Sequence, residues 1–356
     1  MRARVTLHDV AAHADVHIAT VSRALSPATR AKVHPVTAQR IDDAVRALGY
    51  APNALARGLR KQQSATVGVL IPDFTNPLYP PMIRGIESVL LGQGMTALIA
   101  NTDGEHDKQR TAFETLSARQ VDGFIFTTAM RDDPFLRDVH GQGVRAVLLN
   151  RTTDEPLFPA VVSDDASGIQ QVFAHLRKLG HASIAHLAGP ENTSAGHDRR
   201  RCFEAAVAQA GLEATACPVV TGDGFTIEAG RHTMRNLLDS GAEITAVVAG
   251  NDLMAVGAMR ELRSRGMTCP DDVSVAGYND TLLSADIGPG LTTVSVPLAE
   301  LGRAAAAALL ADTATQQLVR LPVHLTVRGS TSQPRLRARK RARKARASGT
   351  YGLEGE

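Results

Sequence analysis

From Ala65 to Ser330, short runs of apolar residues suited to buried strands alternate with longer stretches suited to helices. Parallel strands that are buried on both faces form continuous apolar runs of this kind. The series restarts near Ile184, so we expect two successive doubly wound α/β subdomains with ligand space at the carboxyl ends of their strands. The expected strands are 67–71, 96–100, 123–127, 146–149, 184–188, 246–249 and 273–277, and the expected helices are 82–91, 110–119, 166–179, 199–210 and 253–265.

The first 50 residues predict a small all-α unit instead. Thr6 can cap a helix that begins at the next residue, with Asp9 in the third position of a capping box. A second helix is expected over 18–25 and a third over 37–48, which ends at Gly49, a favourable residue after a helix. Three short helices with a tight turn between the first two form a helix-turn-helix unit.

The two ends of the chain are basic and the region between them is acidic. Residues 1–64 carry 10 Lys and Arg against 4 Asp and Glu, residues 334–356 carry 8 against 2, and the rest carries 21 against 30. Basic ends favour a polyanionic partner such as nucleic acid, although a merely solvated surface would explain either end alone. The run 335–344 has no apolar face that could pack, so we expect a disordered tail over 334–356.

Several stretches of the chain resemble the lactose/galactose-repressor (LacI/GalR) family. The matching residues are 6–11, 16, 19–25 and 49–60 near the start, and 72–77, 121–123, 179–181, 188–190, 251–252, 277–278 and 291–294 further on. The resemblance covers residues 6 to about 330. It implies a DNA-binding head, a hinge, a body built like a periplasmic sugar-binding protein with a cleft between two lobes, and a homodimer.

The expected domain organisation follows from these patterns. The head spans 1–50, a hinge helix and linker span 51–64, and an effector-binding and dimerisation body spans 65–333. Within the body, one subdomain is expected at about 65–164 and 295–322, and the other at about 165–294 and 323–333. Two roles are open for the basic tail, contact with DNA phosphates and solubility alone, and the family offers no precedent for it.

Arg23 is expected on the solvent side of the second helix. Arginine can donate two hydrogen bonds to a guanine in the major groove, although it can also clamp a phosphate or remain an idle surface charge. The resemblance implies that Ile18 and Ala19 select the operator and that Arg23 reads a base. The head residues expected to bind DNA are Thr6, Leu7, His17, Ile18, Ala19, Thr20, Ser22 and Arg23.

Two features of the head depart from the family pattern. His17 stands where a serine usually caps the second helix, which predicts a cap weaker by about 1 kcal/mol and leaves the imidazole free to meet a phosphate. The loop over 26–32 is about two residues longer than usual. Contacts between the second and third helices therefore cannot be carried over from the family.

Residues 53–60 predict a helix of about two turns, which is too short to persist alone in water. Gly58 costs roughly a further 1 kcal/mol relative to alanine. The resemblance implies that two such hinge helices pair in the minor groove, with Leu59 as an apolar wedge that kinks the duplex. The residues expected to bind DNA there are Asn53, Ala56, Leu59 and Arg60; the alternative is an ordinary interdomain linker.

Polar and aromatic residues follow the expected strands of the body, where an open α/β sheet binds ligands. Asp and Asn hydrogen-bond hydroxyl groups, Arg binds hydroxyl pairs or an anion, and an aromatic ring stacks on an apolar ring face. The candidate effector residues are Asp73, Tyr79, Arg151, Asp164, Arg199, Phe225, Asn251, Asp252 and Asn279. Asn279 replaces an aspartate common in the family. A structural hydrogen bond is the alternative for each residue, most of all for Asp164 and Asp252.

Signals of catalysis, metal binding and membrane insertion are weak. The sequence has no phosphate-binding loop, zinc-protease motif, nucleophile elbow or dinucleotide-binding glycine pattern. The three cysteines have no CxxC spacing, and His181 and His186 are spaced so that they should not share a metal. No apolar stretch approaches the roughly 20 residues that span a bilayer, and we expect neither signal peptide nor cofactor.

These patterns together predict a dimeric, cytoplasmic and nucleoid-associated repressor. It would bind a near-palindromic operator in double-stranded DNA and respond to a small polar effector, a sugar or sugar derivative. Three alternatives share the body: a solute-binding protein that serves a transporter, a cytosolic sugar-binding protein without a DNA role, and a sugar-processing enzyme. The basic head opposes the first two, and the third lacks a recognisable catalytic base.

Overall fold

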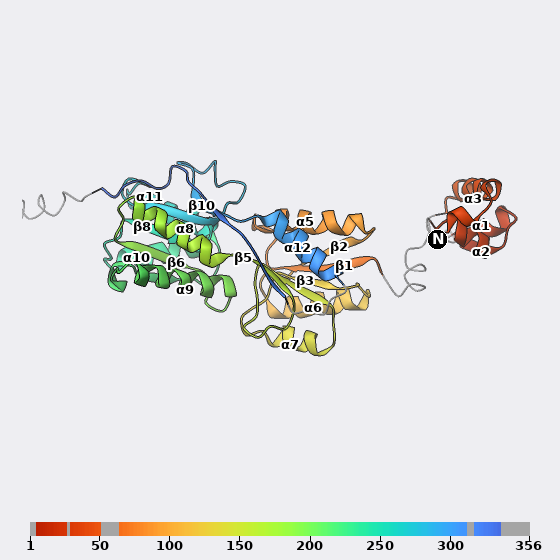
Figure 1. Ribbon diagram of the computed structural model, residues 1–356, viewed down its shortest axis with the longest axis horizontal. Coiled ribbons are helices and arrows are strands. Elements are labelled where there is room, and N and C mark those ends of the chain that lie inside the picture. The colour runs from red at the N-terminus through yellow and green to blue at the C-terminus, as the bar shows by residue number, and fades with distance from the viewer. Residues whose placement is uncertain (1–4, 27–28, 51–63, 312–316, 336–356) are drawn as a thin grey trace, which may run out of the picture. The chain divides into compact units, whose positions relative to one another are not determined.

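A computed structural model describes residues 5–26, 29–50, 64–311 and 317–335 (Figure 1). The chain divides into two units, Met1–Ser64 and Ala65–Glu356. We call the first unit the head and the second the body. The predicted hinge residues Asn53, Ala56, Leu59 and Arg60, and the tail beyond Arg335, lie outside the described residues.

The head contains three α-helices and a short 3-10 turn: α1 Leu7–His13, α2 Ile18–Ala24, η1 Arg30–Lys32 and α3 Pro35–Leu48. Val10, Val21 and Ile41 are fully buried and hold the three α-helices together. The third helix begins two residues before the expected position, because Pro35 suits the first turn of a helix. It ends as expected at Gly49, whose φ of 62° is in the left-handed region that glycine adopts readily.

The body contains two six-stranded sheets, which we call the first and second lobes. The first sheet has the order β11-β5-β4-β3-β1-β2 and all its strand pairs are parallel. Its strands are β1 Thr66–Ile71, β2 Thr96–Asn101, β3 Phe124–Phe126, β4 Ala146–Leu149, β5 Ala160–Ser163 and β11 Leu318–Leu321. Helices α5 Tyr79–Gly92 and α12 Leu298–Leu310 cover one face, and α6 His106–Ala118 and α7 Pro134–Gly141 cover the other (Figure 1).

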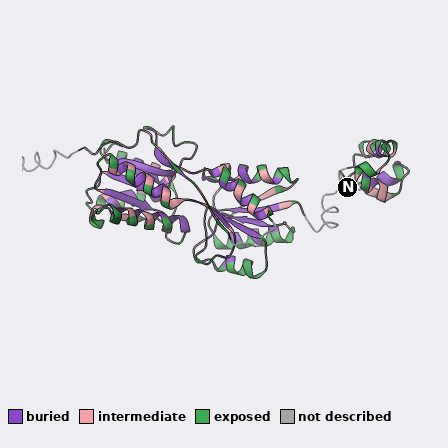
Figure 2. Cartoon of the chain, viewed as in Figure 1, coloured by how far each residue is buried: buried purple, intermediate pink, exposed green. Residues whose placement is uncertain are grey.

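The second sheet has the order β12-β10-β9-β8-β6-β7, with only β12 antiparallel to its neighbour. Its strands are β6 Ile184–Ala188, β7 Val219–Thr221, β8 Ala246–Ala249, β9 Ser274–Asn279, β10 Thr292–Ser295 and β12 His324–Thr326. Helices α8 Asp165–Lys178 and α9 Ser194–Gln209 pack on one face, and α10 Ile227–Asp239 and α11 Asp252–Ser264 pack on the other. A 3-10 turn, η2 Ala214–Ala216, precedes β7. Figure 2 shows the buried strands between helices whose outer faces are exposed.

The chain passes between the two lobes three times. It crosses from β5 to α8, from β10 to α12 and from β11 to β12. The two expected doubly wound subdomains are therefore confirmed. The sequence analysis missed the strands β5, β7, β10, β11 and β12, because a run of three or four residues carries little periodic signal. It also missed the helices α7, α10 and α12.

Asp252 joins the segments that follow β8 and β9 to the start of β10 in the second lobe. Its carboxylate accepts hydrogen bonds from the Thr281 N–H at 2.8 Å and from the hydroxyls of Ser284 and Thr293 at 2.9 and 2.6 Å. The residue is 2% exposed, and burial raises the pKa of its carboxyl although these donors favour the ionised form. Asp252 is thus a structural centre of this lobe.

Replacing Asp252 with Ala should destabilise the body by about 1 to 3 kcal/mol, because buried donors lose their acceptor. Urea unfolding followed by far-UV circular dichroism at fixed protein concentration measures this, since the chain has no tryptophan. Asp286→Ala, at an exposed position in the same region, is the matched control and should change little. Equal stability of the two variants would contradict the role of Asp252.

Candidate functional site

The start of α1 is fixed by the predicted capping box. The Asp9 N–H donates to Thr6 Oγ1 at 3.4 Å, and the Thr6 N–H donates to Asp9 Oδ2 at 2.7 Å. These hydrogen bonds lower the pKa of the Asp9 carboxyl. Leu7 is half-buried against the head core, so this candidate DNA residue also serves packing.

His17 caps α2 through its side chain. Its Nδ1 accepts a hydrogen bond from the Ala19 N–H at 3.2 Å, and its φ and ψ of −68° and 143° are those of a normal N-cap. His17 therefore does cap the helix, and the predicted weakness of this cap relative to serine stays a prediction. An accepting Nδ1 places the ring proton on Nε2, which remains a donor.

Among the residues of α2 that were expected to bind DNA, only Arg23 is exposed. Ala19, Thr20 and Ser22 are half-buried. Ile18 is half-buried and packs against the head core, because α2 begins directly after the tight turn that follows α1. Arg23 is therefore the candidate residue of α2 whose side chain is most accessible to a partner.

The long loop after α2 is fastened to both neighbouring helices. Arg30 donates to the Ala24 carbonyl at 3.1 Å and pairs with Asp42 of α3 at 2.5 Å. The Thr29 hydroxyl donates to the Arg23 carbonyl at 3.0 Å. These contacts hold the described part of the loop against α2 and α3.

In the body, a small cavity lies where the carboxyl ends of both sheets meet. Its volume is about 20 Å³, which is room for about one water molecule. We call it the central cavity, and its lining residues are Asn76, Leu78, Tyr79, Asn150, Arg151, Ala195, Arg199, Phe225, Asn251 and Asn279. Both lobes contribute to its wall, so a molecule bound there would contact both.

Arg199 of α9 is the most constrained charge of the central cavity. The residue is 4% exposed, and its Nη1 donates to the Gly250 carbonyl at 2.8 Å. Its Nε lies 3.2 Å from Asp165 Oδ1, an ion pair without a well-aligned hydrogen bond. The guanidinium carbon lies 3.7 Å from the centre of the Tyr278 ring, a close cation–π contact. Arg199 is thus held at one position in the cavity wall.

Asn251 joins two other parts of the wall. Its Oδ1 accepts from the Met254 N–H at 2.8 Å as the N-cap of α11, and its Nδ2 donates to the Phe225 carbonyl at 3.1 Å. The amide therefore orients Phe225, and the second hydrogen on Nδ2 stays available for a ligand. Tyr79 is almost fully buried at the start of α5, and burial raises the pKa of its hydroxyl.

Six of the nine predicted effector residues line the central cavity, and Asp73, Asp164 and Asp252 do not. Asp73 accepts from the N–H and the hydroxyl of Thr75, both at 2.7 Å. Asp164 caps α8 by accepting from the Ser167 N–H at 3.1 Å. With Asp252 in its internal network, all three carboxylates accept hydrogen bonds within the protein, and Asp164 also lines the larger groove described below.

The sequence analysis missed four lining residues: Asn76, Leu78, Asn150 and Ala195. Asn150 directly follows β4 and has a φ of 69°, so its place after a strand could have identified it. Asn76 lies in the segment 72–77, which resembles the family, but it was not among the predicted effector residues. Leu78 and Ala195 carry no chemical signal in the sequence.

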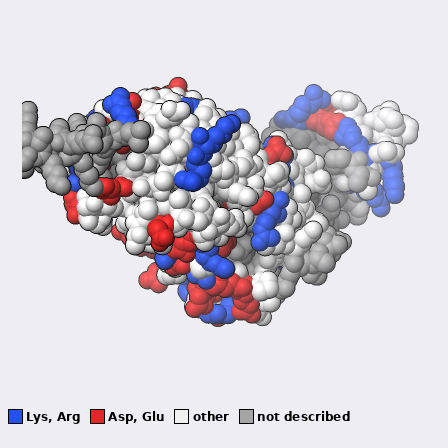
Figure 3. All heavy atoms as spheres, turned by 60° about the vertical axis from the view of Figure 1, so that its left-hand side comes forward, with Lys and Arg blue, Asp and Glu red and all other residues white. Residues whose placement is uncertain are grey.

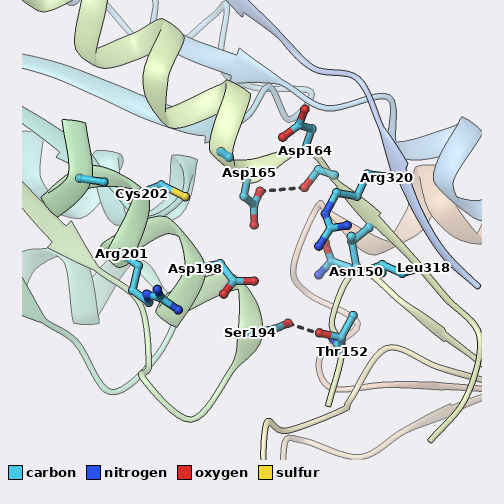
Figure 4. A pocket seen from close by; sticks show the side chains of 14 residues that line it. Asn150, Thr152, Asp164, Asp165, Ser194, Asp198, Arg201, Cys202, Leu318 and Arg320 are labelled. Atoms are coloured by element: carbon cyan, nitrogen blue, oxygen red, sulfur yellow. Dashed lines mark hydrogen bonds between the residues drawn. The ribbon is translucent and has the colours of Figure 1, made fainter. Parts of the chain in front are cut away.

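A larger and more open groove of about 360 Å³ adjoins the central cavity. Its two sides come from α9, with Asp198, Arg201 and Cys202, and from the first lobe, with Asn150 and Arg320 (Figure 4). Segments 150–152 and 194–199 contribute to the walls of both spaces. The Thr152 N–H donates to Ser194 Oγ at 2.9 Å and joins the two lobes between them.

The paired histidines of the second lobe have separate partners. His181 makes hydrogen-bonding contacts of 2.8 Å with the Thr245 hydroxyl and the Ser332 carbonyl. His186 donates from Nδ1 to the Val248 carbonyl at 2.8 Å, and burial lowers its pKa to about 4. Among the described residues, no group of three or more His, Cys, Asp and Glu could hold a metal ion.

Comparison with known proteins identifies both parts of the chain. Residues 6–53 match the family described as bacterial regulatory proteins, lacI family, and residues 64–328 match periplasmic binding proteins and sugar binding domain of LacI family. The chain belongs to the LacI family. It is a DNA-binding transcriptional regulator with a sugar-binding domain, as the sequence analysis predicted.

Relatives and a solved structure extend over nearly the whole chain. The protein is 32% identical over 330 residues to the ribose operon repressor of Halalkalibacterium halodurans, covering 92% of this chain and 97% of that protein. It is 30% identical over 332 residues to catabolite control protein A of Priestia megaterium, covering 92% and 99%. The lac repressor dimer bound to operator and the anti-inducer ONPF superposes with a TM-score of 0.83 at 27% identity, covering 93% and 100%.

The partners of a LacI-family regulator are operator DNA, a small-molecule effector and a second subunit, as predicted. In the part of the chain that the structure describes, no helix combines the length and apolarity needed to cross a bilayer. Figure 3 shows acidic side chains gathered along the lower edge of the body in that view. An acidic body leaves the basic head as the surface suited to DNA.

His17→Ala should weaken operator binding about five- to thirtyfold, because loss of an N-cap costs about 1 to 2 kcal/mol in a helix of seven residues. His17→Asn keeps a cap acceptor and removes the imidazole, so it should bind nearly as well as the parent. Fluorescence anisotropy with operator DNA measures both. Equal losses in the two variants would mean that the cap is not what matters.

Proposed function

We propose that this protein is a repressor whose paired heads read a near-palindromic operator and whose body binds a small polar effector in the central cavity. A two-fold dimer presents two identical heads, so each half-site is read once. In the head, the proposed base reader is Arg23, with Ile18 and Ala19 beside it. Thr6, Leu7, His17, Thr20 and Ser22 are proposed to support this contact and to meet phosphates.

The observation that carries the effector proposal is the composition of the central cavity wall. The proposed contacts are Tyr79, Arg151, Arg199, Phe225, Asn251 and Asn279, which come from both lobes. A ligand that touches both lobes favours one lobe arrangement over another and so shifts the population of DNA-competent dimers. Asp73, Asp164 and Asp252 are proposed as structural residues.

We also infer that the cavity binds rather than catalyses. Its lining contains no Asp, Glu, His, Cys, Ser or Lys that could serve as base or nucleophile, and burial raises the pKa of the lining residue Tyr79, which keeps its hydroxyl protonated. A regulator of operator DNA must reach the chromosome, which supports a cytoplasmic, nucleoid-associated location. The hinge contacts of Asn53, Ala56, Leu59 and Arg60 remain part of the proposal on the strength of the resemblance.

Arg23→Ala should cost about 1 to 3 kcal/mol at one base position of the operator and relax specificity there. The test is anisotropy titration against the native site and its single-base variants, with the site located by genomic footprinting. Arg40→Ala is the matched control, since Arg40 is an exposed arginine on α3. Uniform weakening of all sites by Arg23→Ala, as by Arg40→Ala, would assign Arg23 to a phosphate.

Effector binding in the central cavity should change operator affinity. Thermal-shift screening of sugars, sugar acids, sugar phosphates and purines finds the ligand, and operator titration with and without it measures the coupling. Phe225→Ala should weaken ligand binding while leaving operator binding by the ligand-free protein intact. Stabilisation by purines alone would contradict the sugar assignment and spare the regulator.

A further inference from the structure

The wall of the central cavity carries positive charge without a balancing carboxylate. Of its ten lining residues, Arg151 and Arg199 are cations, four are asparagines and none is Asp or Glu. Neutral sugars are bound well by walls that mix acceptors and donors, such as carboxylates and amides. The question is therefore whether both charges are already neutralised by the protein.

Arg199 is neutralised. Its Nε lies 3.2 Å from the Asp165 carboxylate. Its Nη1 donates to the Gly250 carbonyl, and the guanidinium lies over the Tyr278 ring. Burial raises the pKa of Tyr278 well above its usual value, so this ring stays neutral beside the pair. Arg199 and Asp165 together contribute no net charge to the cavity.

Arg151 has no such partner. Among the described residues it forms no ion pair, and its Nε is buried without a hydrogen-bond partner. Its guanidinium carbon lies 6.0 Å from the centre of the Phe225 ring, which is a weak contact. The Asp73 carboxylate and Arg151 have opposite effects on the pKa of Tyr79, but Asp73 forms no ion pair with Arg151 among the described residues, and its Oδ1 accepts from Thr75. Arg151 is the unpaired cation of the cavity.

Asn279 lines the central cavity from the second lobe and adds no negative charge to its wall. It is 5% exposed at the end of β9 with a φ of 111°, a strained conformation that fixes where its amide lies. An amide there can donate to a ligand oxygen and does not repel an anion, whereas a carboxylate would. The asparagines around the cavity thus serve hydroxyl groups and an anionic group equally well.

We propose that the effector is an anionic polyhydroxy compound, a sugar acid or a sugar phosphate, whose carboxylate or phosphate pairs with Arg151. This rests on the proposed function of the central cavity and names its ligand class. A partly buried guanidinium without a partner is unfavourable, and a ligand oxyanion satisfies it through two parallel hydrogen bonds. Hydroxyl groups then reach the amides of Asn251 and Asn279, and Phe225 covers an apolar ring face.

The ligand enters by a lobe movement. A cavity of about 20 Å³ holds no sugar, whereas the adjoining groove of about 360 Å³ is within the usual range of ligand pockets. The two spaces share Asn150, and the hydrogen bond from the Thr152 N–H to Ser194 Oγ joins the two lobes in the wall of the larger groove. A lobe movement that breaks this hydrogen bond would enlarge the space beside Arg151.

The test compares matched ligands on the full-length protein by isothermal titration calorimetry. The probes are glucose with gluconate, glucuronate and glucose 6-phosphate, galactose with galactonate, galacturonate and galactose 1-phosphate, and ribose with ribonate and ribose 5-phosphate. At least one acid or phosphate should bind about tenfold or more tightly than its neutral counterpart, because hydrogen bonds to charged groups are the strong ones. Whether the acid or the phosphate binds distinguishes the two anion sources.

Two variants assign the preference to its residues. Arg151→Gln should lower affinity for the anion about tenfold or more and leave the neutral counterpart nearly unchanged. Asn279→Asp should weaken the anion selectively by placing a carboxylate opposite it. Arg137→Gln is the matched control: this first-lobe arginine is exposed, pairs with Asp132 at 2.7 Å and should have no effect.

Each other outcome overturns the proposal. Neutral sugars that bind as tightly as the acids and phosphates would remove the anion assignment, and so would an unchanged anion affinity in Arg151→Gln. No binding of any acid or phosphate at millimolar concentration would do the same. In contrast, ligand binding that Phe225→Ala leaves intact would reject the central cavity itself and hence the proposed function.

Discussion

The buried guanidinium of Arg199 organises the ligand-binding half of this protein. A cation that is 4% exposed is tolerated only where its charge and its N–H groups are satisfied. Asp165 at the start of α8, Gly250 at the end of β8 and Tyr278 on β9 supply those partners. Because they come from three separate segments of the chain, the position of Arg199 fixes how the loops around the cavity meet.

The two sheets and the three crossings between them place residues of both lobes around one cavity. Parallel strands send their following loops to the same edge, so each lobe presents its polar loop residues at one end. The crossings bring the two ends together, and Tyr79 and Arg151 of one lobe then face Arg199 and Asn251 of the other. A site shared in this way couples binding to lobe arrangement, which is what an effector-controlled regulator requires.

The stability of the head has a different source from that of the body. Its helices α1 and α2 have seven residues each, so their stability depends on caps and on a small apolar core rather than on length. Thr6 with Asp9 and His17 with Ala19 supply the caps, and Val10, Val21 and Ile41 supply the core. This leaves the side chain of Arg23 exposed on the surface of the head.

The sequence by itself determined the two α/β lobes, the helical head, the cap at Thr6, the helix end at Gly49 and six residues of the central cavity. These follow from local rules: continuous apolar runs, capping chemistry and the place of a residue directly after a strand. Only the tertiary structure decided that Asp252 is a structural acceptor, because Thr281, Ser284 and Thr293 lie 29 to 41 residues away along the chain. It also decided which arginine is neutralised. Arg199 and Arg151 look alike in the sequence, but the tertiary structure gives Arg199 an ion pair with Asp165 and gives Arg151 no ion pair among the described residues.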